Sequence, residues 1–191
     1  MSAAITNMAL MFGAMQVAKK IPFDDNPEIV VYARLGYVSA QLLCLGVFYY
    51  CSIRVKRAND LTVLKYVEPK SPMSQEPGEL VTTTHKDYDL ADINKAMRGV
   101  FMGMLFVGFM HLYMGYTQPL VIQSILPLKN ALESKQAQLW VWGKPATGEL
   151  KRPFKAAPGL FGMQGSAGPQ TDKAAIREAE IAGGAAAKKA E

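Results

Sequence analysis

The sequence has few of the residues from which metal and cofactor sites are usually built. Two cysteines, Cys44 and Cys51, and two histidines, His85 and His111, supply all the thiol and imidazole in 191 residues. Cysteines seven positions apart in one apolar run share a helix face and do not reach each other, so we expect buried thiols and no disulfide. Neither histidine has a companion at ligand spacing. The sequence therefore predicts no metal site and no cofactor.

Catalytic motifs are missing as well. The chain has no nucleophile elbow, P-loop, zincin motif or pair of carboxylates at a useful spacing. Hydroxyl groups are plentiful in VTTTH (residues 81–85), but no base is placed beside them. We therefore expect that this protein is not an enzyme.

Charge is sparse and biased towards basic residues. Lys and Arg number 21 against 16 Asp and Glu, which gives a formal charge of +5. Such a balance fits nucleic-acid binding, anionic lipid or the cytosolic flanks of membrane helices. Half of the residues are hydrophobic, and they gather in a few runs separated by charged stretches. Their distribution therefore points to a membrane protein.

Three apolar runs have the composition of membrane helices, at residues 3–18, 29–53 and 96–116. A bilayer needs about 20 such residues. The first run is shorter and invites a signal-peptide interpretation, but its lysines follow the apolar core, so we favour a retained helix. The second run is the strongest, because Tyr49 and Tyr50 suit the aromatic belt near one membrane surface.

A fourth apolar stretch, at residues 119–132, is too short to cross a bilayer and contains Pro127. It fits an interfacial helix, a re-entrant segment or the returning half of a broken hairpin. Residues 135–191 are rich in Gly, Pro, Lys and Ala and look extended or disordered. We predict an all-α membrane protein, with three transmembrane helices, a short fourth broken or re-entrant helix, a cytosolic loop and a largely extended basic tail. The membrane domain is expected at residues 1–134.

The polar loop at residues 54–95 has a Pro- and Gly-containing centre at 69–78, which we expect to be flexible. After it, Asp87 or Asp89 is placed to cap a helix that continues into the third membrane segment.

Orientation follows from the basic residues. Residues 54–98 carry eight Lys and Arg, whereas the loop before the second run holds only Lys19 and Lys20 beside several acids. Positive residues stay in the cytosol, so the loop and the N-terminus are expected there. The tail carries nine Lys and Arg against five acids and favours the same side, which requires the fourth segment to return across the membrane.

A polar stripe runs along the second helix. Its members recur at i, i+3, i+7 and i+10, which places them on one face: Arg34, Tyr37, Gln41 and Cys44. An arginine at the centre of a membrane helix costs about 2.5 to 3.5 kcal/mol, so it usually faces protein or water. Polar residues of the first and third helices can complete a groove: Asn7, Gln16, Arg98 and His111. The alternative is that Arg34 and Arg98 lie near helix ends and snorkel outward.

Two weaker patterns lie in the first and third helices. They contain most of the eleven methionines, whose flexible side chains adapt to varied apolar partners or pack against lipid. Gly99 and Gly103 form a small-xxx-small pattern, which permits close approach of two helices.

The tail interleaves cations with aromatic residues. The cations are Lys144, Lys151, Arg152 and Lys155, and the aromatic neighbours are Trp140, Trp142 and Phe154. Such a segment can dock on RNA, anionic headgroups or an acidic protein surface, or can simply be a solvated face.

Several polar stretches together resemble one fungal endoplasmic-reticulum membrane protein family. They are NDLTVLKYVEP (59–69), VTTTHKDYDL (81–90), GFMHLYMGYTQPLVIQSILPLKNALE (108–133), GKPATGELKRPFKAAPGLFG (143–162) and TDKAAIREAEIAGG (171–184). Members were first assigned to inorganic phosphate transport and later placed as the third component of the SRP-independent (SND) targeting pathway.

The resemblance implies a factor that delivers or inserts membrane-protein clients at a Sec61-type translocon near ribosomes. Its partners would be the translocon, the ribosome (including ribosomal RNA), hydrophobic client segments and the lipid bilayer. We expect an insertase-like groove at Arg34, Tyr37, Gln41, Arg98 and His111, with docking through the loop and basic tail. Phosphate transport is the chief alternative, although the chain shows no repeat and few helices. A non-catalytic translocon adaptor is the other.

Overall fold

The computed structural model describes residues 3–23, 25–68, 79–154, 169–177 and 179–181. The fold is mostly helical with one small sheet. The chain divides into two compact units, one of Met1–Arg54 with Ala91–Gly143, the other of Val55–Leu90 with Lys144–Glu191. The unit boundaries differ from the expected boundary after residue 134, because the polar loop groups with the tail. Residues 69–78, Lys155 and the end of the tail lie outside the described residues.

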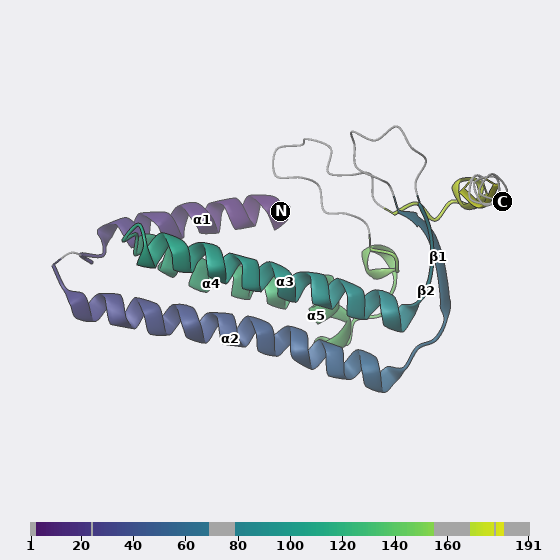
Figure 1. Cartoon of the computed structure of the whole chain (residues 1–191), viewed down its shortest axis with the longest axis horizontal. Coiled ribbons are helices and arrows are strands. Elements are labelled where there is room, and N and C mark those ends of the chain that lie inside the picture. Colours follow the sequence, from purple (N-terminus) through teal and green to yellow (C-terminus); the bar gives the residue numbers. More distant parts are fainter. Residues whose placement is uncertain (1–2, 24, 69–78, 155–168, 178, 182–191) are drawn as a thin grey trace. The chain divides into compact units, whose positions relative to one another are not determined.

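The first unit is built from five helices (Figure 1). They are α1 (Ala3–Lys20), most of α2 (Pro27–Ala58), most of α3 (His85–Leu112), α4 (Gln118–Glu133) and α5 (Lys135–Trp140). Within this unit α1 packs on α4, and α2, α3 and α4 meet at a small core of Tyr37, Val107 and Leu120. Short connections between consecutive helices favour neighbours that run antiparallel.

Helix α2 starts at Pro27, where a missing N–H costs nothing, and the Asn26 side chain accepts a hydrogen bond from the backbone of Glu28. Its 32 residues extend about 48 Å, beyond the roughly 30 Å of hydrocarbon in a bilayer. Buried positions recur every three or four residues along one stripe: Tyr37, Ala40, Gln41, Cys44, Phe48, Cys51 and Val55. Both cysteines are buried on it, as predicted, and neither forms a disulfide.

The prediction of three membrane spans is supported for α2 alone. Among the described residues, it is the one helix with the length and apolar composition to cross a bilayer. Helix α1 has 18 residues and ends on two lysines. Helix α3 begins at His85 with a polar stretch and stops at Leu112, four residues before the predicted end, and its apolar part includes Arg98 and His111. Polar residues within these segments lower their hydropathy below that of α2.

Helix α4 corrects the prediction of a broken fourth segment. It runs unbroken through Pro127 for 16 residues. A proline inside a helix removes one hydrogen bond and leaves a carbonyl without its usual donor four residues earlier. The helix can continue when another group supplies that donor, and α2 supplies it here, as the site geometry shows.

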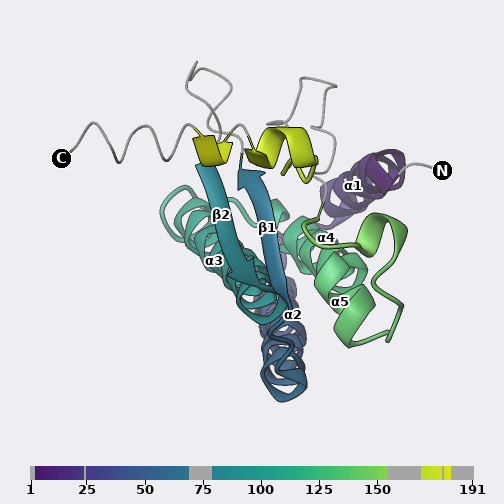
Figure 2. The same ribbon diagram turned by 90° about the vertical axis from the view of Figure 1, so that its right-hand side faces the viewer.

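The described part of the predicted polar loop contains two paired strands, which the sequence interpretation missed. Strands β1 (Val63–Glu68) and β2 (Glu79–Thr84) pair antiparallel from Val63 opposite Thr84 to Glu68 opposite Glu79 (Figure 2). Both strands are rich in β-branched and aromatic residues, and β1 buries Leu64, Tyr66 and Val67. Such composition was an available strand signal. The prediction of an all-α fold is therefore wrong for this segment.

The described part of the tail contains regular structure that was not predicted. Gln170 pairs with Val67 through two backbone hydrogen bonds on β1. A short 3₁₀ turn, η1, spans Gly148–Leu150, and residues 173–177 and 179–181 are helical. Lys65 of β1 forms an exposed ion pair with Glu180. Within the second unit, Gln170 and Glu180 of the tail thus contact strand β1.

The start of α3 shows how the hairpin passes into a helix. The Thr84 hydroxyl accepts the backbone N–H of Asp87 at 3.1 Å and donates to its carboxylate at 2.8 Å. Thr84 is therefore the capping residue and Asp87 supports it from the third helical position. Asp89, the other predicted cap, is fully buried and serves a different purpose.

Candidate functional site: a cavity among α2, α3 and α4

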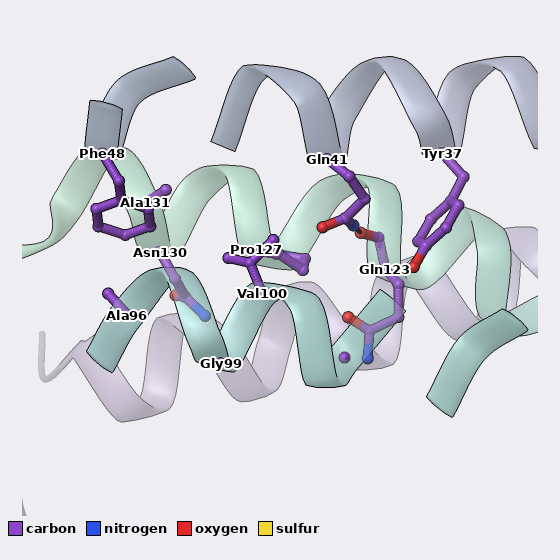
Figure 3. Close-up of a pocket in the computed structure, with 11 residues that line it drawn as sticks. Tyr37, Gln41, Phe48, Ala96, Gly99, Val100, Gln123, Pro127, Asn130 and Ala131 are labelled. Carbon is purple, nitrogen blue, oxygen red and sulfur yellow. Dashed lines mark hydrogen bonds between the residues drawn. The ribbon is translucent and has the colours of Figure 1, made fainter. Parts of the chain in front are cut away.

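A cavity of about 280 Å³ lies within the first unit, between α2, α3 and α4 (Figure 3). Its polar lining consists of Tyr37 and Gln41 from α2 and Gln123 and Asn130 from α4. The remaining lining is apolar or backbone, from Phe48, Ala96, Gly99, Val100, Gly103, Pro127 and Ala131. None of the lining side chains carries a full charge. The cavity is thus an apolar space with a few neutral hydrogen-bonding groups.

Gln41 bridges two helices at this cavity. Its side-chain Nε2 donates to the backbone carbonyl of Gln123 at 2.9 Å. Gln123 lies four residues before Pro127, so its carbonyl is the one whose helical donor the proline removes. The Gln41 side chain is 3% exposed and replaces that missing donor. The sequence interpretation placed Gln41 in a groove but did not foresee this partner.

Tyr37 brings an unsatisfied hydroxyl to the cavity. The residue is 7% exposed, and its phenol oxygen is buried with no hydrogen-bond partner among the described residues. Its ring packs with Val107 and Leu120, which fixes the hydroxyl at the cavity wall. An unpaired buried hydroxyl costs about 1 to 3 kcal/mol. A polar atom left in this state marks a place where a ligand group can bind.

The glycines of α3 have a different role from the predicted one. A Cβ atom built on Gly99 or Gly103 meets nothing within 4 Å, so these residues do not permit a close helix approach in this structure. Both line the cavity. Their missing side chains therefore contribute to its volume, and this corrects the interpretation as a helix-packing motif.

Arg34 and His111 pair with each other and do not line the cavity. The Arg34 Nε–H donates to Nε2 of His111 at 2.9 Å, and His111 Nδ1 lies 3.1 Å from the carbonyl of Tyr116. His111 is 9% exposed, whereas Arg34 belongs to the exposed class. Arg98 is exposed and absent from the cavity lining, so the structure does not bring it to Tyr37 and Gln41.

A polar link joins α1 to α4 beside the cavity. The Lys129 ammonium donates to the Asn7 side-chain carbonyl at 2.7 Å, and the Asn7 amide donates to Asn130 at 3.0 Å. Lys129 also pairs with Glu133 one turn later. Asn7 was expected to join the polar face, whereas the sequence interpretation assigned no role to Lys129. Gln16 is exposed on α1 and is not among the lining residues.

The cations predicted to form a docking surface differ in their exposure. Lys144 and Lys151 are exposed. Arg152 points inward and donates two hydrogen bonds to Asp89, at 2.8 and 2.6 Å. The Arg152 side chain is 9% exposed, and the Asp89 side chain is fully buried. This pairing removes Arg152 from the predicted docking surface. Lys155 lies outside the described residues.

Phe154, an aromatic residue beside these cations, also packs inside the fold. Phe154 is buried, its backbone N–H donates to the Tyr88 hydroxyl at 2.7 Å, and its ring meets Tyr88 edge-on. Tyr88 in turn meets Tyr66 of β1 edge-on. Burial, with the nearby charge of Glu68, raises the pKa of Tyr66. In the first unit Trp142 is exposed and donates its indole N–H to the Leu132 carbonyl.

His85, the other histidine, belongs to a surface cluster with Asp60. Their side chains lie 2.9 Å apart. The hydroxyl of Thr62, its backbone N–H and then His85 lower the pKa of Asp60 to about 2. No group of three or more His, Cys, Asp or Glu side chains in the described ranges is arranged to hold a metal ion.

Comparison with known proteins agrees with the resemblance. The chain matches the profile of the family described as "Phosphate transport (Pho88)" over residues 1–187. It is 45% identical to SRP-independent targeting protein 3 of Saccharomyces cerevisiae, over 98% of this chain and 99% of that protein. A Schizosaccharomyces pombe homolog of SRP-independent targeting protein 3 is 39% identical, over 87% of this chain and 85% of its own length.

A second Schizosaccharomyces pombe protein, uncharacterized by name, is 46% identical over 85% of this chain and 80% of its own. No solved structure matches the chain. A profile match across nearly the whole length, together with relatives of this identity, settles the assignment: the chain belongs to the Pho88 family of fungal SRP-independent targeting protein 3 relatives.

Proposed function

We propose that this chain is an endoplasmic-reticulum membrane factor that targets and inserts membrane-protein clients independently of SRP. The observation that carries the proposal is the cavity with neutral polar groups inside a helical unit whose outer faces are apolar. The names of two relatives, which state SRP-independent targeting, supply the biological setting.

The surface of the first unit supports a position in the bilayer. Large apolar side chains are exposed along α1, α2 and α3, among them Phe12, Leu42, Leu43, Leu105 and Phe106. Soluble monomers rarely expose apolar patches of such extent. In a bilayer these side chains contact lipid, and the exposed methionines Met8, Met11 and Met102 add an adaptable apolar surface.

The cavity would lower the free-energy cost of moving a polar client group into the membrane. A polar group that enters hydrocarbon without a partner costs several kcal/mol. A client group that passes beside Tyr37 and Gln41 would meet hydrogen-bonding atoms at membrane depth, which lowers that cost. Helices α1 and α4, with 18 and 16 residues, extend only about 27 and 24 Å, and short helices thin the adjacent bilayer.

The polar segments would provide docking to a Sec61-type translocon and to ribosomes. Lys144 and Lys151 present exposed cations in the second unit. Basic side chains next to a membrane attract phosphate-rich surfaces such as ribosomal RNA or anionic lipid. In this arrangement residues 54–95 face the cytosol and the chain crosses the membrane more than once.

Site-specific photocrosslinking tests the proposal. A small aliphatic photoreactive side chain in place of Val100 lies at the cavity where a side chain already stands, whereas Gly108, on the same helix, does not line it. In ribosome-bound microsomes with a stalled membrane-protein client, we expect client crosslinks from position 100 and few from 108. Crosslinks from position 100 to lipid or translocon subunits alone would contradict insertion through the cavity.

Phosphate transport remains a second candidate because the family description names it. A phosphate site requires converging cations or backbone N–H groups, and the cavity lining contains no cation. Phosphate uptake by vesicles that contain only this protein would favour transport. A tethering role alone is the third candidate, and it predicts that deletion of residues 144–191 abolishes function while changes at Tyr37 and Gln41 do not.

A further inference from the structure

We infer that the cavity is selective for one neutral hydrogen-bonding side chain, such as an amide or hydroxyl, on an otherwise apolar client segment. The inference rests on the proposed insertion function and names the class of group that the cavity accepts. Its basis is the juxtaposition of the unpaired Tyr37 hydroxyl with the Gln41 amide in a lining that has no charged residue.

The volume suits a side chain. The cavity measures about 280 Å³. One or two side chains of a client helix fit into such a space, with the rest of the helix in lipid or against other surfaces.

The polar atoms define what that side chain must offer. One hydrogen of Gln41 Nε2 is donated to the Gln123 carbonyl, and the side-chain oxygen of Gln41 can accept a hydrogen bond from an occupant. Tyr37 lies one turn earlier on the same face, and its hydroxyl both donates and accepts. A group with a donor and an acceptor, such as Asn, Gln, Ser or Thr, can satisfy both atoms.

A charged side chain is a poor fit. The lining has no counter-ion, and a buried charge without one pays a desolvation cost of several kcal/mol. Wholly apolar side chains fit sterically but leave the Tyr37 hydroxyl unpaired. The cavity therefore prefers neutral polar groups over both charged and apolar ones.

Two substitutions separate selectivity from occupancy. Tyr37→Phe removes the hydroxyl and keeps the ring, and because that hydroxyl is unpaired its loss does not destabilise the empty protein. Gly103→Leu fills the cavity, and Gly108→Leu is its matched control on the same helix. All three are made in the full-length protein in endoplasmic-reticulum microsomes.

The clients are model segments of identical apolar sequence that carry Leu, Gln, Asp or Lys at the central position. With the unaltered protein we expect protein-dependent insertion to be highest for the Gln segment. Tyr37→Phe should lower insertion of the Gln segment roughly fivefold relative to the Leu segment, the size of one hydrogen bond. Gly103→Leu should abolish the advantage of the Gln segment, and Gly108→Leu should preserve it.

Each other outcome has a distinct meaning. Equal loss for all four segments in Gly103→Leu, with no effect of Tyr37→Phe, would overturn the selectivity and leave the insertion function standing. No effect of Gly103→Leu on any segment would overturn both. If native mass spectrometry in lipid nanodiscs finds a bound lipid that Gly103→Leu displaces while insertion is unchanged, the occupant is an acyl chain and the inference is wrong.

Discussion

The side-chain amide of Gln41 on α2 donates to the carbonyl of Gln123 on α4 at 2.9 Å, and that carbonyl is the one left without a donor by Pro127. A helix passes through an internal proline only where another group satisfies the freed carbonyl, most strictly in a dry environment. Gln41 thus joins two helices and forms part of the cavity wall at the same time. Its effects on stability and on function must be measured separately.

Loss of the Gln41 amide should destabilise the first unit. Gln41→Leu leaves the Gln123 carbonyl without a donor, and we expect a loss of about 1 to 3 kcal/mol in the free energy of unfolding. Pro127→Ala restores a backbone N–H for the same carbonyl. In a double-mutant cycle measured by unfolding in detergent micelles, Gln41→Leu should cost markedly less in the Pro127→Ala background. Equal costs in the two backgrounds would rule out this relationship.

The buried pair of Asp89 and Arg152 should be critical to the second unit. Asp89→Ala removes the carboxylate that accepts both hydrogen bonds from Arg152, whose side chain is 9% exposed, and breaking a buried ion pair costs about 3 to 5 kcal/mol. We expect faster proteolysis of the tail near residues 144–154 in the full-length protein. Replacement of both partners, Asp89→Leu with Arg152→Leu, should restore much of the protection. Greater damage from the double change than from Asp89→Ala would contradict the explanation.

The Asp60 cluster predicts how the stability of the second unit changes at acidic pH. Its pKa is lowered from 3.8 to about 2 by the hydrogen bonds from Thr62 and by His85. The unfolded chain therefore binds a proton before the folded chain does, so the stabilisation is complete above about pH 4 and is lost as the pH falls towards 2. Protection of residues 60–68 against hydrogen exchange, relative to the unfolded chain at the same pH, should fall over this range. Asp60→Asn should remove that part of the pH dependence, and an unchanged profile would contradict it.

The sequence predicts the helices well where the apolar pattern is long. Helix α2 was expected at residues 29–53 and is observed at Pro27–Ala58; of the predicted face, Tyr37, Gln41 and Cys44 are buried and Arg34 is exposed. Periodicity decides such cases, because the buried stripe of a helix repeats every three to four residues. The family was also predicted, since its polar stretches are more distinctive than its hydrophobic ones.

What the sequence did not predict depends on partners far along the chain. The hydrogen bond from Gln41 spans 82 positions, and the pairing of Arg152 with Asp89 spans 63. No local pattern distinguishes an arginine that docks outward from one that turns inward to a buried carboxylate. Gly99 and Gly103 show the same limit, because the spacing of small residues does not tell whether a helix or a cavity lies opposite.

The polar link between α1 and α4 yields the last prediction. Asn7→Leu removes the acceptor of Lys129 and the donor to Asn130. Lys129 keeps Glu133 as a partner, so we expect a moderate cost of about 1 to 2 kcal/mol. The loss should appear as faster hydrogen exchange in α1 when the protein is held in lipid nanodiscs. Gln16→Leu, an exposed change on the same helix, is the control and should leave exchange unaltered. If both changes accelerate exchange equally, the link does not hold α1 in place, and the apolar contacts of α1 with α4 must do so.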